Sequence, residues 1–198
     1  MFSASVFALL TVGIIVVLIT PGPTNTLLAA AGLRQGVRRS LPLIAGELAG
    51  YLVSISAWGR FLTHASYALP WLPSLLRVAA GLYIAYLAID MWRTAVALPD
   101  STLRTSGMRT LFVATLLNPK ALLFAGTIFP SIAFTHMPAY VLAMLTFACL
   151  AVPIALAWIA FGAALGSGKL WLNPVNMQRG ASIVLGVFSL SLAWAALH

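Results

Sequence analysis

The hydrophobic positions of this chain fall into six long runs separated by short polar stretches. The runs lie at about residues 3–33, 41–62, 75–92, 108–134, 139–165 and 180–197. They are continuous and apolar on all sides, without the alternation of lipid-facing β-strands. A helix of about 20 residues crosses a hydrocarbon core of about 30 Å and satisfies all its backbone groups in lipid. The pattern therefore predicts an all-α integral membrane protein with six transmembrane helices in one domain, residues 1–198.

The composition agrees with this prediction and excludes several other classes of protein. Of the 198 residues, 62% are hydrophobic and 7% are charged, whereas a soluble domain carries about 25% charged residues. An ordinary cytosolic enzyme, a disordered chain and a nucleic-acid-binding module are excluded on this ground. The N-terminal run has no basic start and no small-residue cleavage site, so we interpret it as a retained first helix and not as a signal peptide.

The net charge of +8 is explained by the distribution of basic residues between loops. With six crossings, the loops on one side of the membrane hold eight basic residues: Arg34, Arg38, Arg39, Arg93, Arg104, Arg109, Lys169 and Arg179. The loops on the other side hold two, Arg60 and Arg77. Basic loops stay in the cytoplasm and are attracted to anionic lipids. We therefore expect both termini outside, with membrane lipid and not nucleic acid as the partner of the basic residues.

A weak internal repeat divides the chain into two halves of three helices, about 1–92 and 107–198. Because three is odd, the second half enters the membrane from the opposite side. The first helix of each half is broken by proline, at Pro21-Gly22-Pro23 and at Asn118-Pro119. Paired interruptions at matching positions of two inverted repeats are a pointer to a transporter binding site. We predict two inverted three-helix repeats, although a simple proline kink is the alternative at either break.

Each break is expected to start a new half-helix inside the membrane. Asn118 before Pro119 is typical of an N-cap and first helical residue, and Thr20 or Gly22 takes that place before Pro21 or Pro23. The free N–H groups and positive dipole end of such a restart suit a carboxylate. Candidate substrate-binding residues at the two breaks are Pro21, Gly22, Pro23, Asn25, Asn118, Pro119 and Lys120.

Two charged residues lie within the apolar runs. Lys120 lies about twelve residues into the fourth run, and Glu47 about six residues into the second. A charge near the membrane centre costs about 2.5–3.5 kcal/mol on insertion scales, so both are functional candidates. Glu47 is predicted to bind a proton or a substrate ammonium, and Lys120 a carboxylate. The alternatives are a structural Glu47–Lys120 ion pair, or a Lys120 side chain that reaches to the interface.

These motifs resemble the lysine exporter (LysE/RhtB) family of bacterial inner-membrane amino-acid exporters over nearly the whole chain. The resemblance rests on Ile19-Thr20-Pro21-Gly22-Pro23, Gly36, Gly46 with Gly50, Gly81-Leu82-Tyr83-Ile84-Ala85-Tyr86-Leu87 and Leu117-Asn118-Pro119-Lys120-Ala121. It implies export of amino acids or related metabolites driven by the proton-motive force. Many members have a small or apolar residue where this chain has Glu47, and exporters of basic amino acids tend to have an acid in this helix.

Several other chemistries find little support in the sequence. There is no phosphate-binding loop for ATP and no catalytic constellation, so neither a cofactor nor an enzyme is expected. The histidines His64, His136 and His198 are expected on the outer side, in loops or at the terminus, without metal-ligand spacing, and Cys149 is the one cysteine. Divalent-metal export by the same fold and a non-transport membrane protein remain the alternatives. Glycine pairs such as Gly32/Gly36, Gly46/Gly50 and Gly162/Gly166 indicate close helix packing, with a homodimer as a second interpretation.

Overall fold

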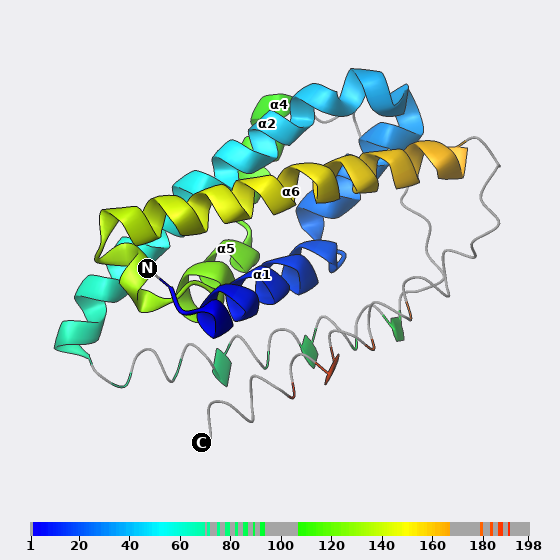
Figure 1. The fold of residues 1–198 in the computed structure, drawn as a ribbon. Coiled ribbons are helices and arrows are strands. Elements are labelled where there is room, and N and C mark those ends of the chain that lie inside the picture. The colour runs from blue at the N-terminus through cyan, green and yellow to red at the C-terminus, as the bar shows by residue number, and fades with distance from the viewer. Residues whose placement is uncertain are drawn as a thin grey trace.

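The computed structural model describes residues 2–69 and 107–166, with single positions between 71 and 93 and between 179 and 190. This part is helical: α1 (Ala4–Ile19), α2 (Pro23–Ala68), α4 (Met108–Leu116), α5 (Pro119–Leu123), the π-helical η1 (Phe124–Ile128), the 3₁₀-helical η2 (Ser131–Phe134) and α6 (Met137–Gly166). Figure 1 shows α6 lying along the bundle, packed against α1 and α2. The helices predicted at 75–92 and 180–197 fall mostly outside the described residues, as do Arg77, Arg104, Lys169 and His198.

The first predicted helix consists of α1 and the start of α2, separated by the predicted break. Ser3 caps α1, and its hydroxyl accepts a hydrogen bond from the Val6 N–H at 3.3 Å. The helix ends at Ile19, two residues before Pro21, which has no N–H with which to continue it. α2 then begins with Gly22 as N-cap and Pro23 in the first turn, so Gly22 and not Thr20 is the capping residue.

A sharp turn at Gly36 divides α2 into a first arm, residues 23–35, and a second arm, residues 37–68. Gly36 has φ 77° and ψ 172°, a conformation that only glycine adopts without strain. Figure 1 shows the second arm running back from this turn. The second arm is longer than the 41–62 expected from the sequence, because no proline or glycine signal stops it at Leu62. His64 therefore lies on a helix and not in a loop, and its ring hydrogen-bonds the Arg60 carbonyl at 2.9 Å.

The fourth predicted helix is interrupted twice and not once. The predicted break at Asn118-Pro119 is present, and α4 is bent by 47° from the helical segment Pro119–Ile128 that follows it. The expectation from the sequence that this segment continues to 134 is wrong. Pro130 cannot donate to a preceding carbonyl and forces Phe129 into an extended conformation. The chain therefore passes through η1 and η2 before α6 begins.

Glycines let the helix backbones approach closely. A Cβ atom at Gly32 on the first arm would overlap the Ile159 carbonyl of α6, and one at Gly162 would overlap the Ala29 carbonyl of the first arm. On the second arm, a Cβ at Gly50 would lie 2.8 Å from the Phe112 carbonyl oxygen of α4. The predicted close packing is thus present within the chain at these positions but not at Gly36, whose Cβ position is open, and these glycines give no separate support to a homodimer, the second interpretation.

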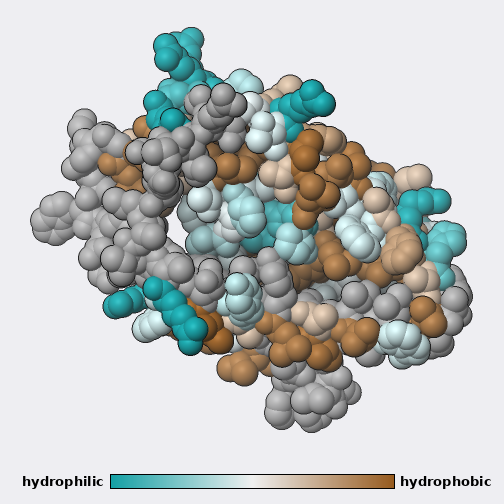
Figure 2. Space-filling model, turned by 180° about the vertical axis from the view of Figure 1, so that it is seen from behind, coloured by the Kyte–Doolittle hydropathy of each residue, from teal (hydrophilic) through white to brown (hydrophobic). Residues whose placement is uncertain are grey.

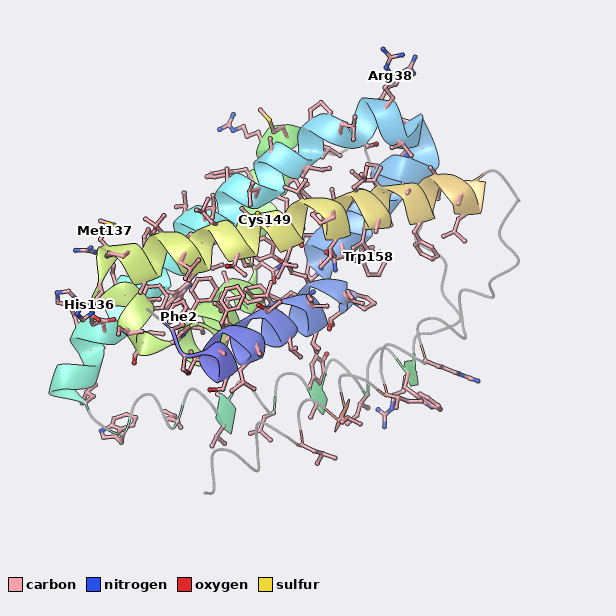
Figure 3. The ribbon with its side chains drawn as sticks, in the orientation of Figure 1. Phe2, Arg38, His136, Met137, Cys149 and Trp158 are labelled. Carbon is pink, nitrogen blue, oxygen red and sulfur yellow. The ribbon has the colours of Figure 1, made fainter. Side chains whose placement is uncertain are left out.

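The helices of the described part are long and apolar enough for a membrane protein. α2 and α6 each contain a candidate span, and the bent pair Met108–Leu116 with Pro119–Ile128 makes a third if it is counted as one. Figure 3 places Arg38 at one end of the bundle, and Phe2, His136 and Met137 at the other. The Arg179 guanidinium lies 5.3 Å from the centre of the Trp92 ring, and the charge distribution of the sequence assigns both residues to the same side of the membrane.

Candidate functional site

The first helix break leaves a short unwound stretch whose carbonyls are bound by a neighbouring side chain. Thr20 ends α1, and both its N–H and its hydroxyl donate to the Val16 carbonyl, at 3.2 and 2.8 Å. The last carbonyls of a helix have no partner within it. Here the Asn25 amide, from the first turn of α2, donates to the Leu18 and Thr20 carbonyls at 2.7 Å each. Asn25 thus ties the end of α1 to the start of α2.

The second helix break is capped by Asn118, as the sequence predicted. Its side-chain oxygen accepts a hydrogen bond from the Lys120 backbone N–H at 3.0 Å, with Pro119 in the first turn of α5. On the other side of the break, the Ser54 hydroxyl of α2 donates to the Leu116 carbonyl near the end of α4, at 2.9 Å. The backbone groups freed by the break therefore have partners from within the bundle.

The side chain of Lys120 joins the two breaks directly. Its ammonium donates to the Thr20 carbonyl at 2.5 Å, although the two residues are 100 positions apart. Lys120 is 2% exposed, so its side chain does not reach to the bundle surface. Gly22 makes room for it, since a Cβ at that position would lie 3.0 Å from Lys120 Cε and 3.1 Å from Nζ.

A second connection between the breaks runs through hydroxyl and amide groups. The Asn118 side-chain nitrogen donates to Thr24 Oγ1 at 3.3 Å and to the Tyr51 hydroxyl at 3.2 Å. The Thr24 and Tyr51 hydroxyls lie 3.3 Å apart and are hydrogen-bonded to each other. The Tyr51 ring is fully buried and makes edge contacts with Phe124 and Phe147. Four elements, α2, α5, η1 and α6, thus meet at this point.

Glu47 lies beside this network on the second arm of α2. It is 4% exposed, and its carboxyl interacts with the Thr24 side chain and with the charge of Lys120. Because Tyr51 follows four residues later, the two side chains share one face of the helix. We call the seven residues that meet here the polar cluster: Thr20, Thr24, Asn25, Glu47, Tyr51, Asn118 and Lys120.

The structure separates the sequence-predicted site residues into two groups. Asn25, Glu47, Asn118 and Lys120 are buried in the polar cluster. The prolines and Gly22 set the backbone instead: Pro23 and Pro119 are exposed, and Pro21 and Gly22 are half-buried. The roles of Thr20 and Thr24 in this cluster were missed from the sequence, and for Tyr51 the sequence left lining of a cavity and packing in the membrane core equally open. The spacing of four residues from Glu47 was the available signal for Tyr51.

The polar cluster combines one acidic and one basic side chain in an apolar surrounding. Figure 2 shows hydrophilic residues recessed near the centre of one face, with apolar residues above them and to their right. Within the residues that the structure describes, no fully buried side-chain nitrogen or oxygen lacks a hydrogen-bond partner. In the same part, no three His, Cys, Asp or Glu side chains come together to hold a metal ion.

Comparison with known proteins gives one match. The family model described as LysE type translocator matches residues 15–198, which include both breaks and every residue of the polar cluster. No match was found among curated proteins or solved structures. Members of the matched family are membrane transporters of small molecules such as amino acids, and not enzymes. Because the match covers far more than half of its length, the chain belongs to the LysE type translocator family.

Proposed function

We propose that this translocator exports amino acids or close analogues in exchange for protons, with the polar cluster as its substrate site. The observation that carries this proposal is the meeting of two proline-broken helices around a buried lysine and a buried glutamate. Ionisable residues inside a membrane protein are costly and mark substrate or ion pathways. Broken helices that expose backbone groups at the same point are typical of transporter binding sites.

The charges of the polar cluster suit a zwitterion. The Lys120 ammonium has three N–H donors, of which one is used by the Thr20 carbonyl. The remaining donors would bind a substrate carboxylate. Glu47 would receive the substrate ammonium from the second arm of α2. We infer that Pro21, Gly22, Pro23 and Pro119 shape this site through the backbone, whereas Asn25, Glu47, Asn118 and Lys120 surround the substrate.

Glu47 is our proposed proton-coupling residue. A buried carboxylate is costly unless a cation or hydrogen bonds compensate its charge. A substrate ammonium would supply that compensation, and a proton would supply it when the substrate has left. Exchange of one for the other at a single carboxyl couples substrate export to proton entry. Within the described residues Glu47 is the one acidic side chain, so no other carboxyl group there could take the role of proton carrier.

The larger architecture is part of the same proposal. We infer two inverted three-helix repeats, in which α1 with the first arm of α2 corresponds to α4 with α5 and η1. This correspondence is supported by the break after the first helix of each pair. We also infer a location in the bacterial inner membrane, with the arginine-rich Gly36 turn in the cytoplasm and both termini outside. The charge distribution supports this orientation.

Counterflow in proteoliposomes tests this function. Vesicles preloaded with one unlabelled amino acid are diluted into trace radiolabelled amino acid, over a panel of basic, neutral and acidic side chains. We expect transient uptake of the label for at least one amino acid of the panel. In a separate assay, in which a pH gradient drives net uptake into vesicles without preloaded amino acid, Glu47→Gln should take up less label than the parent protein. Uptake of Mn²⁺ with no counterflow of any amino acid would contradict the proposal and favour metal export.

A further inference from the structure

The open end of α1 is bound by a cation that belongs to the protein itself. A helix ends with carbonyl groups that have no partner and with about half a negative charge from its dipole. At α1 the Asn25 amide binds the Leu18 and Thr20 carbonyls, and the Lys120 ammonium binds the Thr20 carbonyl. In the described part of the chain, the ammonium is the only charged group that is hydrogen-bonded to this helix end.

Burial of the Lys120 side chain and the absence of a side chain at Gly22 fix the position of the ammonium. Lys120 comes from α5, beyond the second break, and its side chain crosses to the first break without exposure to the surface. Gly22 leaves the space through which its last carbon and its nitrogen pass, because any side chain there would begin about 3 Å from both atoms. An adaptable surface lysine would need neither the glycine nor the burial. The arrangement is therefore a built site for a positive charge.

Free monovalent cations bind at the same kind of place in other broken-helix transporters. In those proteins, carbonyls of the unwound backbone and the C-terminal ends of half-helices coordinate sodium, while half-helix N-termini face the substrate carboxylate. The Thr20 carbonyl of this chain is both part of an unwound stretch and the C-terminal end of a half-helix. Lys120 Nζ lies where such an ion would be coordinated.

We propose that the Lys120 ammonium is a tethered cation which permanently occupies a monovalent-cation site at the C-terminal end of α1, so that the protein needs no sodium there. The tethered-cation proposal rests on the proposed function in one respect only, namely the claim that transport needs no sodium. Removal of the side chain should leave a site for a free organic cation of matching size. n-Propylammonium has the three carbons and the nitrogen that Lys120→Ala removes, so it is the probe.

Thermal unfolding of the purified protein tests the site without any transport assay. We expect Lys120→Ala to unfold at a lower temperature than the parent protein. n-Propylammonium chloride should recover half or more of that loss in a saturable manner, and tetramethylammonium chloride at equal ionic strength should not. Lys120→Met fills the space without a charge, so it should be destabilised and not recovered. Arg38→Ala, which removes an exposed charge at the Gly36 turn, controls for general charge effects.

Two further measurements keep the proposal open to contradiction if Lys120→Ala does not fold. Lys120→Arg keeps the positive charge and should retain more stability than Lys120→Met. In the parent protein, unfolding and counterflow should be the same in sodium chloride and choline chloride. The proposal is overturned if Lys120→Met is as stable as the parent protein, if n-propylammonium and tetramethylammonium act alike on Lys120→Ala, or if counterflow requires sodium. Failure of all amino acids in counterflow would instead contradict the proposed function and leave the unfolding result standing.

Discussion

At the scale of single residues, Asn118 carries two tasks in one side chain. Its oxygen caps the restarted helix by accepting the Lys120 N–H, and its nitrogen donates to Thr24 and Tyr51. The cap stabilises the restarted helix at the break, whereas the donated hydrogen bonds connect Asn118 to the other residues of the polar cluster. The two tasks are separable because different substitutions remove different atoms.

Replacement of Asn118 by alanine should affect both stability and transport. Loss of the cap is expected to lower the free energy of unfolding by about 0.5–2 kcal/mol. Asn118→Ser keeps a capping hydroxyl but loses the amide donors, so it should unfold near the parent temperature. Both variants should show a raised KM in counterflow.

The comparison of the two variants is the check on this assignment. Tyr140→Phe is the matched control, because it removes a hydroxyl that contacts Ser56, outside the polar cluster. If Asn118→Ser has the same KM as the parent protein and only Asn118→Ala is less stable, the role of Asn118 is confined to capping the helix at the break.

The candidate site was predictable from sequence where charge or proline stood out against apolar surroundings. Glu47, Lys120 and Asn118 could be selected because a charge or a capping amide next to proline is unusual inside an apolar run. Thr24 and Tyr51 could not be selected in this way. Their side chains are common in membrane helices, and only the three-dimensional meeting of the two breaks gives their hydroxyls a shared role.

At the scale of elements, the direction of α2 depends on one backbone conformation at Gly36. The turn brings the second arm back along the bundle, so that Glu47 and Tyr51 reach the breaks. Nothing lies within 4 Å of the Cβ position at Gly36. A side chain there would therefore meet no steric contact, and any cost of adding one comes from the backbone alone.

Gly36→Ala should be destabilising in spite of this open space. The backbone conformation at Gly36 costs about 1–3 kcal/mol for a residue with a Cβ, and the free energy of unfolding should fall by that order. Gly107→Ala controls for the added methyl group, because its Cβ position is equally open and its φ of −79° is ordinary. Gly107 is the N-cap of α4, where alanine is less favourable than glycine, so each variant is compared with the parent protein. An unfolding temperature for Gly36→Ala equal to that of the parent protein would mean that the turn at Gly36 tolerates a side chain.

The helix breaks were more predictable than the helix ends. Proline at 21, 23 and 119 interrupts helices for a local reason, and the sequence analysis located both breaks correctly. Gly36 was expected in the basic loop between the first two predicted helices and as a packing position, whereas the sharpness of its turn was not foreseen, since a positive φ leaves no signature in a single sequence. Pro130 was overlooked inside an apolar run, which led to the wrong end at 134 for the fourth helix.

At the scale of the whole molecule, family membership confirms the resemblance and excludes a non-transport membrane protein. The all-helical membrane fold was predictable because lipid leaves few choices for the backbone. The inverted repeat and the orientation stay predictions. Both depend on how the two halves sit in the membrane, and the third helix of each half falls mostly outside the described residues.

The orientation can be checked by cysteine labelling in intact cells. Arg38 and His136 are exposed and lie at opposite ends of the bundle (Figure 3). In a Cys149→Ser background, an impermeant maleimide should label His136→Cys and not Arg38→Cys, because arginine-rich turns stay in the cytoplasm. Lysed cells, in which both should react, provide the control. Labelling of Arg38→Cys alone in intact cells would reverse the orientation.

The central claim is that the polar cluster exchanges substrate for a proton at Glu47. Proteoliposomes with a trapped pH-sensitive dye allow amino-acid exchange and proton movement to be measured on the same preparation. The parent protein should show both, and Glu47→Gln, which resembles the protonated side chain, should retain exchange but lose proton movement and pH-driven accumulation. Glu47→Asp should recover part of both. Accumulation by Glu47→Gln at the parent rate and with the same pH dependence would contradict the claim and leave Glu47 as a structural partner of Lys120.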